Sequence, residues 1–167
     1  KVSDEGIAIK YIVLTHGHAD HISGVNEHLD DFPDAKVVVH TNEKPMLEDP
    51  RENQSLMFGS AQTVKGDIFV NDGDELEVGD LKLKFIFTPG HTPGGMCIYV
   101  ESEDVLFSGD TLFRQSIGRT DFPGGSFRDL ADAVHTKLFI LPDQTVVLPG
   151  HMGQTSIGFE KENNPFV

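Results

Sequence analysis

The sequence predicts a single α/β domain covering residues 1–167, and three features support this prediction. The first forty residues alternate between strand and helix patterns, and the middle of the chain contains apolar segments paired across short turns. A length of 167 residues also suits one domain that buries roughly two-thirds of the surface of its unfolded chain. We therefore expect an α/β opening followed by an antiparallel middle.

The opening elements follow from local composition. Residues 10–14 read as a buried strand, residues 22–32 as a helix closed by Pro33, and residues 36–40 as a second strand, whose three central valines are all β-branched. Residues 42–49 suit a short helix capped by Asn42, and the polar residues 50–66 read as a long loop.

The later elements are mostly strands. Residues 75–78 and 81–87 form a predicted hairpin, and residues 96–100 and 105–107 form another. Residues 109–125 read as irregular, residues 126–139 have helical periodicity, residues 145–148 form a last strand, and residues 156–163 suit a closing helix.

Charge and cysteine content exclude several classes of protein. The chain has 13 basic and 27 acidic residues, a net charge of −14, which argues against a nucleic-acid or anionic-membrane partner. Cys97 is the only cysteine and lies in an apolar run, so we expect a buried thiol and no internal disulfide. No apolar run reaches the roughly 18 residues of a membrane-spanning segment. A cytoplasmic location is the expectation.

The densest group of polar side chains follows the first strand, in the segment Thr-His-Gly-His-Ala-Asp-His at residues 15–21. His16, His18, Asp20 and His21 are residue types that bind zinc, iron or manganese. If the strand continues through His18, then His16 and His18 point to the same side and can share an ion. Asp20 and His21 leave the backbone in another direction where a helix begins, so two adjacent ions fit better than one.

Three further apolar strands end in a metal-binding residue type. Pro-Gly-His occurs at residues 89–91 and again at 149–151, and Gly109-Asp110 follows the strand between them. Loops that leave the same rim of a sheet can aim such side chains at a common point. We therefore expect a site assembled from distant parts of the sequence.

Taken together, these motifs resemble the metallo-β-lactamase superfamily, and within it the short, single-domain hydrolases similar to glyoxalase II. The motifs that carry the resemblance occur in the family's order: residues 15–21, 88–95, 109–113, 118–121 and 149–151, with the C-terminal residues 156–166. The resemblance implies an α/β fold in which two mixed sheets form an αββα sandwich with helices on the outer faces.

The resemblance also implies a ligand set and a reaction. One metal would be held by His16, His18 and His91, a second by Asp20, His21 and His151, and Asp110 would bridge both, with a hydroxide completing the bridge. Zinc is the leading metal, with iron or manganese as alternatives. The bridging hydroxide, held with the help of Asp20 and Asp110, would attack a small thioester such as an acylglutathione.

Two other functions remain open at this point. Persulfide dioxygenases of the superfamily use one iron and also carry Gly-Arg-Thr-Asp-Phe, which matches residues 118–122. The other alternative is a non-catalytic metal-binding module.

Several residues near these motifs have two readings. Arg119 and Asp121 could form a pair that orients a metal ligand, or a salt bridge within a loop. Phe113, Phe122 and Phe127 could wall a substrate pocket or fill the core. Three histidines outside the motifs are expected to be structural: His28, His40 and His135.

The N-terminus carries a further expectation. Members of the superfamily place several strands before the one that enters the histidine cluster, and only residues 1–9 precede it here. We expect that the natural protein has an N-terminal extension, or that a partner chain, such as a second copy in a homo-oligomer, covers the free edge of this strand.

Overall fold

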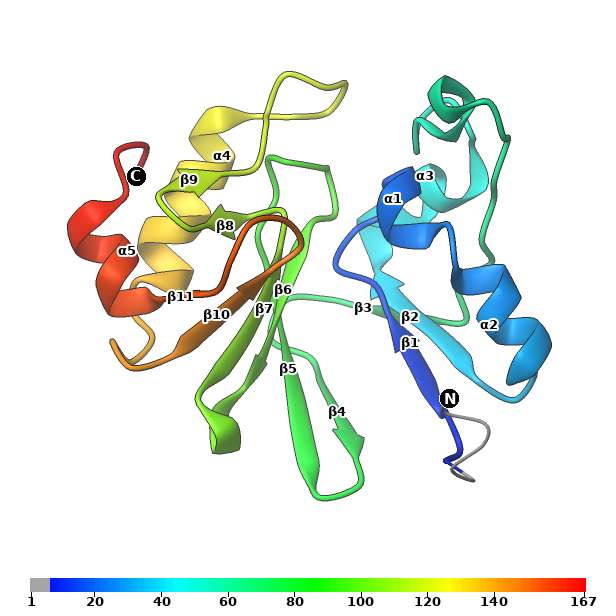
Figure 1. Ribbon diagram of the computed structural model, residues 1–167, viewed down its shortest axis with the longest axis horizontal. Coiled ribbons are helices and arrows are strands. Elements are labelled where there is room, and N and C mark those ends of the chain that lie inside the picture. Colours follow the sequence, from blue (N-terminus) through cyan, green and yellow to red (C-terminus); the bar gives the residue numbers. More distant parts are fainter. Residues whose placement is uncertain (1–6) are drawn as a thin grey trace.

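The computed structural model describes residues 7–167, in which two sheets face each other and helices cover their outer sides (Figure 1). α1, α2 and α3 lie outside the first sheet, and α4 and α5 lie outside the second (Figure 1). The αββα sandwich expected from the sequence is confirmed. No helix within residues 7–167 has both the length and the apolar composition needed to cross a bilayer.

The first sheet contains three parallel strands in the order β1, β2, β3. Their bounds are Tyr11–Val13, Lys36–His40 and Ile68–Val70. The helices α1 (Ala19–Ile22) and α2 (Val25–Asp31) connect β1 to β2. A 3-10 turn, η2 (Thr41–Glu43), then α3 (Lys44–Glu48) and a second 3-10 turn, η3 (Ser55–Phe58), connect β2 to β3.

The second sheet has the order β11, β10, β7, β6, β5, β4 and is mixed. The strands β4 (Glu75–Val78), β5 (Leu81–Phe87), β6 (Met96–Val100) and β7 (Val105–Gly109) are antiparallel neighbours, which confirms both predicted hairpins. β10 (Val146–Pro149) pairs parallel with β7, and β11 (Thr155–Ser156) pairs antiparallel with β10.

Short elements complete the second half. The turn η4 (Glu101–Glu103) joins β6 to β7, and β8 (Leu112–Phe113) pairs with β9 (Ser116–Ile117). The predicted helix over 126–139 is α4 (Phe127–Ala133), which continues as a π-helical turn, η5 (Val134–Leu138). The closing helix is α5 (Ile157–Asn163).

Alternation along the central strands places their side chains in three apolar layers. On β2, Val37 and Val39 pack toward the helices, whereas Val38 faces the second sheet, and all three are fully buried. On β6, Met96 lies between the sheets and Cys97 lies beneath η5 and α5. Burial on both faces explains why these strands are apolar throughout.

Three details of the sequence prediction are wrong. The first strand ends at Val13, so residues 14–18 form a loop and strand alternation does not place His16 and His18. The helix expected over 22–32 is broken between α1 and α2, where Gly24, a poor helix former, is the residue before the second helix. Asn42 is no cap, because the His40 ring accepts a hydrogen bond from the Asn42 amide at the start of η2.

Among residues 7–167, the strand that pairs with β1 is β2, and β1 therefore stands at the edge of its sheet. The part of the N-terminal expectation that concerns residues 1–6 lies outside the described residues.

Candidate metal centre

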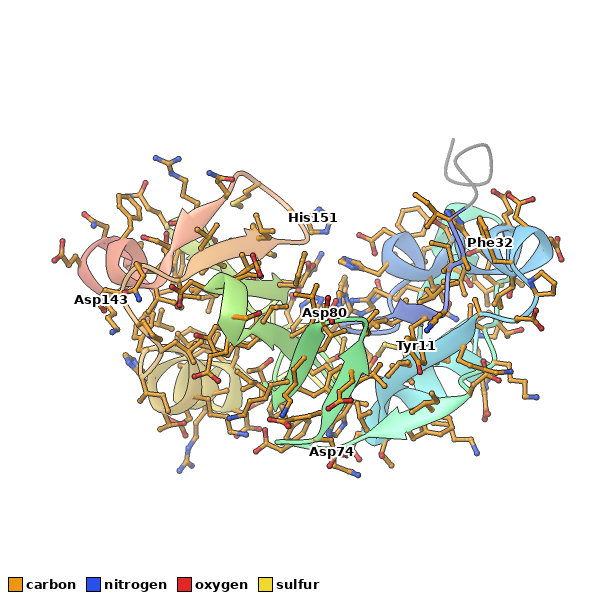
Figure 2. All side chains as sticks on the ribbon, turned by 90° about the horizontal axis from the view of Figure 1, so that it is seen from below. Tyr11, Phe32, Asp74, Asp80, Asp143 and His151 are labelled. Carbon is orange, nitrogen blue, oxygen red and sulfur yellow. The ribbon has the colours of Figure 1, made fainter. Side chains whose placement is uncertain are left out.

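Four strands end at one rim of the sandwich and place the predicted ligands there. The loop after β1 carries His16 and His18, the loop after β5 carries His91, Asp110 directly follows β7, and His151 follows β10. Asp20 and His21 lie in α1. Figure 2 shows His151 between the two halves of the molecule. The structure brings all seven predicted residues together in three overlapping groups.

The first group contains His16, His18 and His91, all of them buried. One ring nitrogen from each lies within 4.8 Å of the others. The His18 Nδ1 and the His91 Nε2 face each other at 2.9 Å. Three imidazoles converging on one point provide the donor set typical of a zinc or iron site.

The outward nitrogens of these three rings have partners of their own. His91 Nδ1 donates to the Arg119 carbonyl oxygen at 2.8 Å, which leaves Nε2 free to bind a metal. His16 Nδ1 lies 3.2 Å from the Thr15 hydroxyl oxygen. His18 Nε2 lies 3.1 Å from the side-chain amide of Gln54. A metal on His18 Nδ1 requires a proton on Nε2, which the Gln54 amide oxygen can accept once the amide is turned over.

The second group contains Asp20, His21 and His151, whose donor atoms also lie within 4.8 Å of one another. His151 Nε2 is 3.1 Å from a carboxylate oxygen of Asp20, and His21 Nε2 is 3.8 Å from the same oxygen. The side chains of Asp20 and His151 are about half exposed. This group is therefore more open to solvent than the first.

Asp110 lies between the two groups. Its carboxylate oxygens are 3.5 Å from His91 Nε2 in the first group, and 3.3 Å and 3.4 Å from the Nε2 atoms of His21 and His151 in the second. One carboxylate in this place can contact ions at both groups.

The unsatisfied polar atoms in the site fit a bound cation. Within residues 7–167, His16 Nε2 and Asp110 Oδ1 are buried without a hydrogen-bond partner. Buried polar atoms are normally paired, because an unpaired donor or acceptor costs free energy. A metal ion would satisfy both atoms.

The electrostatics of the first group and of Asp110 also favour metal binding at neutral pH. Burial, together with the neighbouring histidines, lowers the pKa of His16 well below its ordinary value. Burial, followed by the charge of a protonated His91, lowers the pKa of His18 to about 4. Burial alone would raise the pKa of Asp110, but the nearby rings of His21, His91 and His151 lower it below its ordinary value. Neutral imidazoles and an ionised carboxylate are the forms that bind metals.

A pocket of about 450 Å³ opens over the two groups. Its wall combines five of the predicted ligands, His18, Asp20, His91, Asp110 and His151, with five apolar side chains: Phe58, Phe113, Ile117, Phe122 and Met152. Phe113 and Phe122 therefore line the pocket, whereas Phe127 is half-exposed at the start of α4 and does not.

Arg119 contributes to the site through its backbone. Its guanidinium makes two hydrogen bonds of 2.8 Å to Asp121 and stacks over Phe122 at 3.7 Å, and it is more than half exposed. The side-chain pair is thus a salt bridge within the loop. The support of His91 comes from the Arg119 carbonyl group.

The histidines outside the motifs have structural contacts. His28 donates to the Gly24 carbonyl oxygen, His40 stacks on Phe87, and His135 packs edge-on against Phe139.

Sequence reasoning missed residues that hold the loops of the site in place. Asn53 is fully buried, and its carbonyl oxygen accepts the Ala19 amide at the start of α1, while its side chain bonds the Gln62 carbonyl oxygen. These bonds fix the loop that carries Gln54 beside His18. The polar run around these residues gives no pattern that would have predicted their burial.

Comparison with known proteins identifies the family. The family model described as the metallo-beta-lactamase superfamily matches residues 1–151. The chain belongs to this superfamily.

Relatives in the superfamily cover nearly all of this chain. The probable metallo-hydrolase YqgX of Bacillus subtilis is 40% identical over 99% of this chain and 79% of its own length. The hydroxyacylglutathione hydrolase GloC of Haemophilus influenzae is 33% identical over 100% of this chain and 80% of its own length.

Solved structures of the superfamily have the same fold. The BLEG-1 B3 metallo-beta-lactamase superposes with a TM-score of 0.91 at 40% identity, over 99% of this chain and 80% of its own. TTHA1623, in a di-iron-bound form, superposes with a TM-score of 0.85 at 29% identity, over 99% of this chain and 81% of its own. ETHE1 from Myxococcus xanthus superposes with a TM-score of 0.79 at 32% identity, over 98% of this chain and 65% of its own. The superfamily binds divalent metals, and its histidine and aspartate cluster is present here.

Proposed function

We propose that this metallo-hydrolase holds two divalent ions and cleaves a small thioester. The observation that carries the proposal is the pair of ligand groups, each with donor atoms within 4.8 Å of one another, joined by Asp110. His16, His18 and His91 would hold one ion, Asp20, His21 and His151 the other, and Asp110 would contact both.

Two bound ions supply an activated water and a positive site for the oxygen of the reacting carbonyl group. The protein holds the ligands in the correct protonation states. The Arg119 carbonyl oxygen keeps the proton of His91 on Nδ1. The Gln54 amide, once turned over so that its oxygen faces His18, would hold a proton on Nε2 of His18. Asp20 borders the pocket and is half exposed, so it can accept a proton from water that enters the site.

The residues fit more than one metal. Zinc suits the three imidazoles of the first group, and the second group, which adds the Asp20 carboxylate to two imidazoles, suits zinc, iron or manganese. The similarity to TTHA1623, solved in a di-iron-bound form, supports the iron alternative. Zinc remains the first metal to test.

The apolar wall of the pocket supports a small organic ester as the substrate. Phe58, Phe122 and Met152 offer apolar contacts around the metal groups, as ligand pockets commonly do. A thioester suits this site because a thiolate leaves readily, without help from a strong acid. The similarity to GloC makes an acylglutathione the first substrate to test.

The test uses the full chain loaded with zinc, iron or manganese. Metal content is measured by elemental analysis, and hydrolysis is measured on a thioester panel that includes S-lactoylglutathione. We expect about two ions per chain and turnover that is lost when His16 is replaced by alanine. One ion per chain, or no hydrolysis of any thioester in any metal form, would contradict the proposal.

A persulfide dioxygenase with one iron is the second candidate. Residues 118–122 match the motif of that group, and ETHE1 from Myxococcus xanthus is 32% identical to this chain. The two ligand groups favour the hydrolase, because a single iron would leave Asp20, His21 and His151 without a shared ion. Oxygen uptake with a persulfide, together with one iron per chain, would favour the dioxygenase. Turnover of any substrate would dismiss a non-catalytic module.

We also propose a cytoplasmic location and a small-molecule substrate rather than a nucleic-acid or membrane partner. The net charge of −14 and the single buried thiol of Cys97 support this proposal. Cell fractionation would test the location, and sedimentation would show whether copies of the chain associate through the β1 edge.

A further inference from the structure

Glu43 is a buried carboxylate that lies between the two loops carrying the first ligand group. It ends η2, and its side chain is fully buried. Its Oε2 accepts the backbone N–H of Gly17 at 2.7 Å, and its Oε1 accepts that of Gly94, also at 2.7 Å. Gly17 stands between His16 and His18, and Gly94 follows His91 by three residues.

The chains approach closely at both contact points, and at Gly94 they leave no room for a Cβ. A Cβ on Gly94 would lie 2.6 Å from the Glu43 backbone nitrogen and 2.7 Å from Glu43 Cγ. A Cβ on Gly17 would lie 3.2 Å from Glu43 Oε2 and 3.1 Å from Met46 Cγ. The glycines within both histidine motifs therefore serve the contact with Glu43.

The chemistry of the contact suits an ionised carboxylate. Each of its two oxygens faces one N–H donor, and hydrogen bonds to a charged acceptor are stronger than neutral ones. Burial raises the pKa of Glu43 above its ordinary value, and the hydrogen bonds from Gly17 and Gly94 oppose that rise. The two donors are separated from Glu43 by 26 and 51 residues, so the side chain joins segments that the sequence keeps apart.

We propose that Glu43 is a positioning residue for the first metal site. By holding Gly17 and Gly94 together, it sets the separation between His91 and the pair His16 and His18. The inference rests on the ligand set proposed above and adds a residue that touches neither metal nor substrate.

The test replaces Glu43 with glutamine, which keeps the shape but turns one acceptor oxygen into an NH₂ group facing an N–H donor. Glu160→Gln is a matched control. Glu160 is equally buried, and its carboxylate accepts the Gln115 amide and the Asn164 side chain, neither of which carries a predicted ligand. Cobalt binding is followed by its visible absorption, and unfolding is followed by calorimetry.

We expect Glu43→Gln to weaken binding of the first cobalt ion by about 10- to 100-fold, the usual effect of losing a residue that holds a metal ligand in place. Glu160→Gln should lower the melting temperature but leave cobalt affinity within about twofold of wild type. If both variants lower the melting temperature and neither changes cobalt affinity, Glu43 is only a core residue and the inference fails.

A measurement on the wild-type chain covers the case in which Glu43→Gln does not fold. The amide hydrogens of Gly17 and Gly94 should exchange slowly even without metal, because the Glu43 carboxylate holds both. Fast exchange at either amide in the folded, metal-free chain would overturn the inference. Failure of the wild type to bind cobalt would instead refute the proposed metal site, and the exchange rates would still decide whether Glu43 joins the two loops.

Discussion

Replacing Asp110 by asparagine should damage the enzyme far more than replacing either member of the nearby Arg119–Asp121 pair. The Asp110 carboxylate lies within 3.3 to 3.5 Å of the Nε2 atoms of His21, His91 and His151 and can contact both ions. Asparagine keeps the shape but removes the charge. Loss of one preorganised electrostatic group in an active site typically costs about 100- to 1,000-fold in rate, or about 2.7–4 kcal/mol.

The Arg119 and Asp121 side chains are 55% and 67% exposed, and ion pairs as exposed as this one contribute little free energy. Arg119→Ala also keeps the carbonyl group that holds His91. Each single substitution should therefore lower kcat/KM by less than about fivefold. The assay measures kcat/KM on one thioester together with the metal content of each variant. Equal damage from all three substitutions, or two tightly bound ions in Asp110→Asn, would refute the bridging role.

Three further predictions concern stability, the buried thiol and the pocket. Chelation of the metal should lower the melting temperature by roughly 8–16 °C in calorimetry, because a ligand at 1,000 times its Kd adds about 4 kcal/mol to the free energy of unfolding. An unchanged melting temperature would contradict metal binding to the folded state. Burial raises the pKa of Cys97 to about 11, so iodoacetamide at pH 8 should label it only in denaturant. Because the pKa of Cys97 in the folded state lies above its ordinary 9.0, the thiol contributes stability below pH 9, and that contribution is lost as the pH rises toward 11. The free energy of unfolding in urea should therefore fall between pH 9 and pH 11, and this fall should be absent in Cys97→Ala. Phe58, 75% exposed on the pocket wall, should raise KM when changed to alanine, whereas Leu56→Ala in the same turn should not.

The candidate site could be predicted from the sequence because its residues lie in short motifs directly after apolar strands. Each strand fixes where its loop begins, and the repeated Pro-Gly-His pattern marks two loops that the fold brings together. His16 and His18 do converge, as predicted, but not because of strand alternation, since both lie in a loop after the strand ends. Their loop is held by contacts such as the bond between the Gly17 amide and Glu43, which come from elsewhere in the chain.

The elements that were missed are too short to leave a pattern. β3 has three residues, of which Phe69 is exposed, so it lacks a run of alternating positions. β8 and β9 have two residues each, and the turn between them contains Gln115 at a φ of 55° without the glycine or asparagine that usually marks such a turn.

Glu43 shows the same limit at the site. It stands between Asn42 and Lys44, in the segment that reads as a short helix. Its burial is decided by two loops that dock on it from 26 and 51 residues away. Local composition carries no signal of such long-range contacts.

Anomalous diffraction from crystals of the zinc- or iron-loaded protein would test the central claim most directly. We predict two metal peaks about 3.5–4 Å apart. One should lie among His16, His18 and His91, the other among Asp20, His21 and His151, and Asp110 should contact both. A single peak, or a second ion bound away from His151, would contradict the two-metal centre.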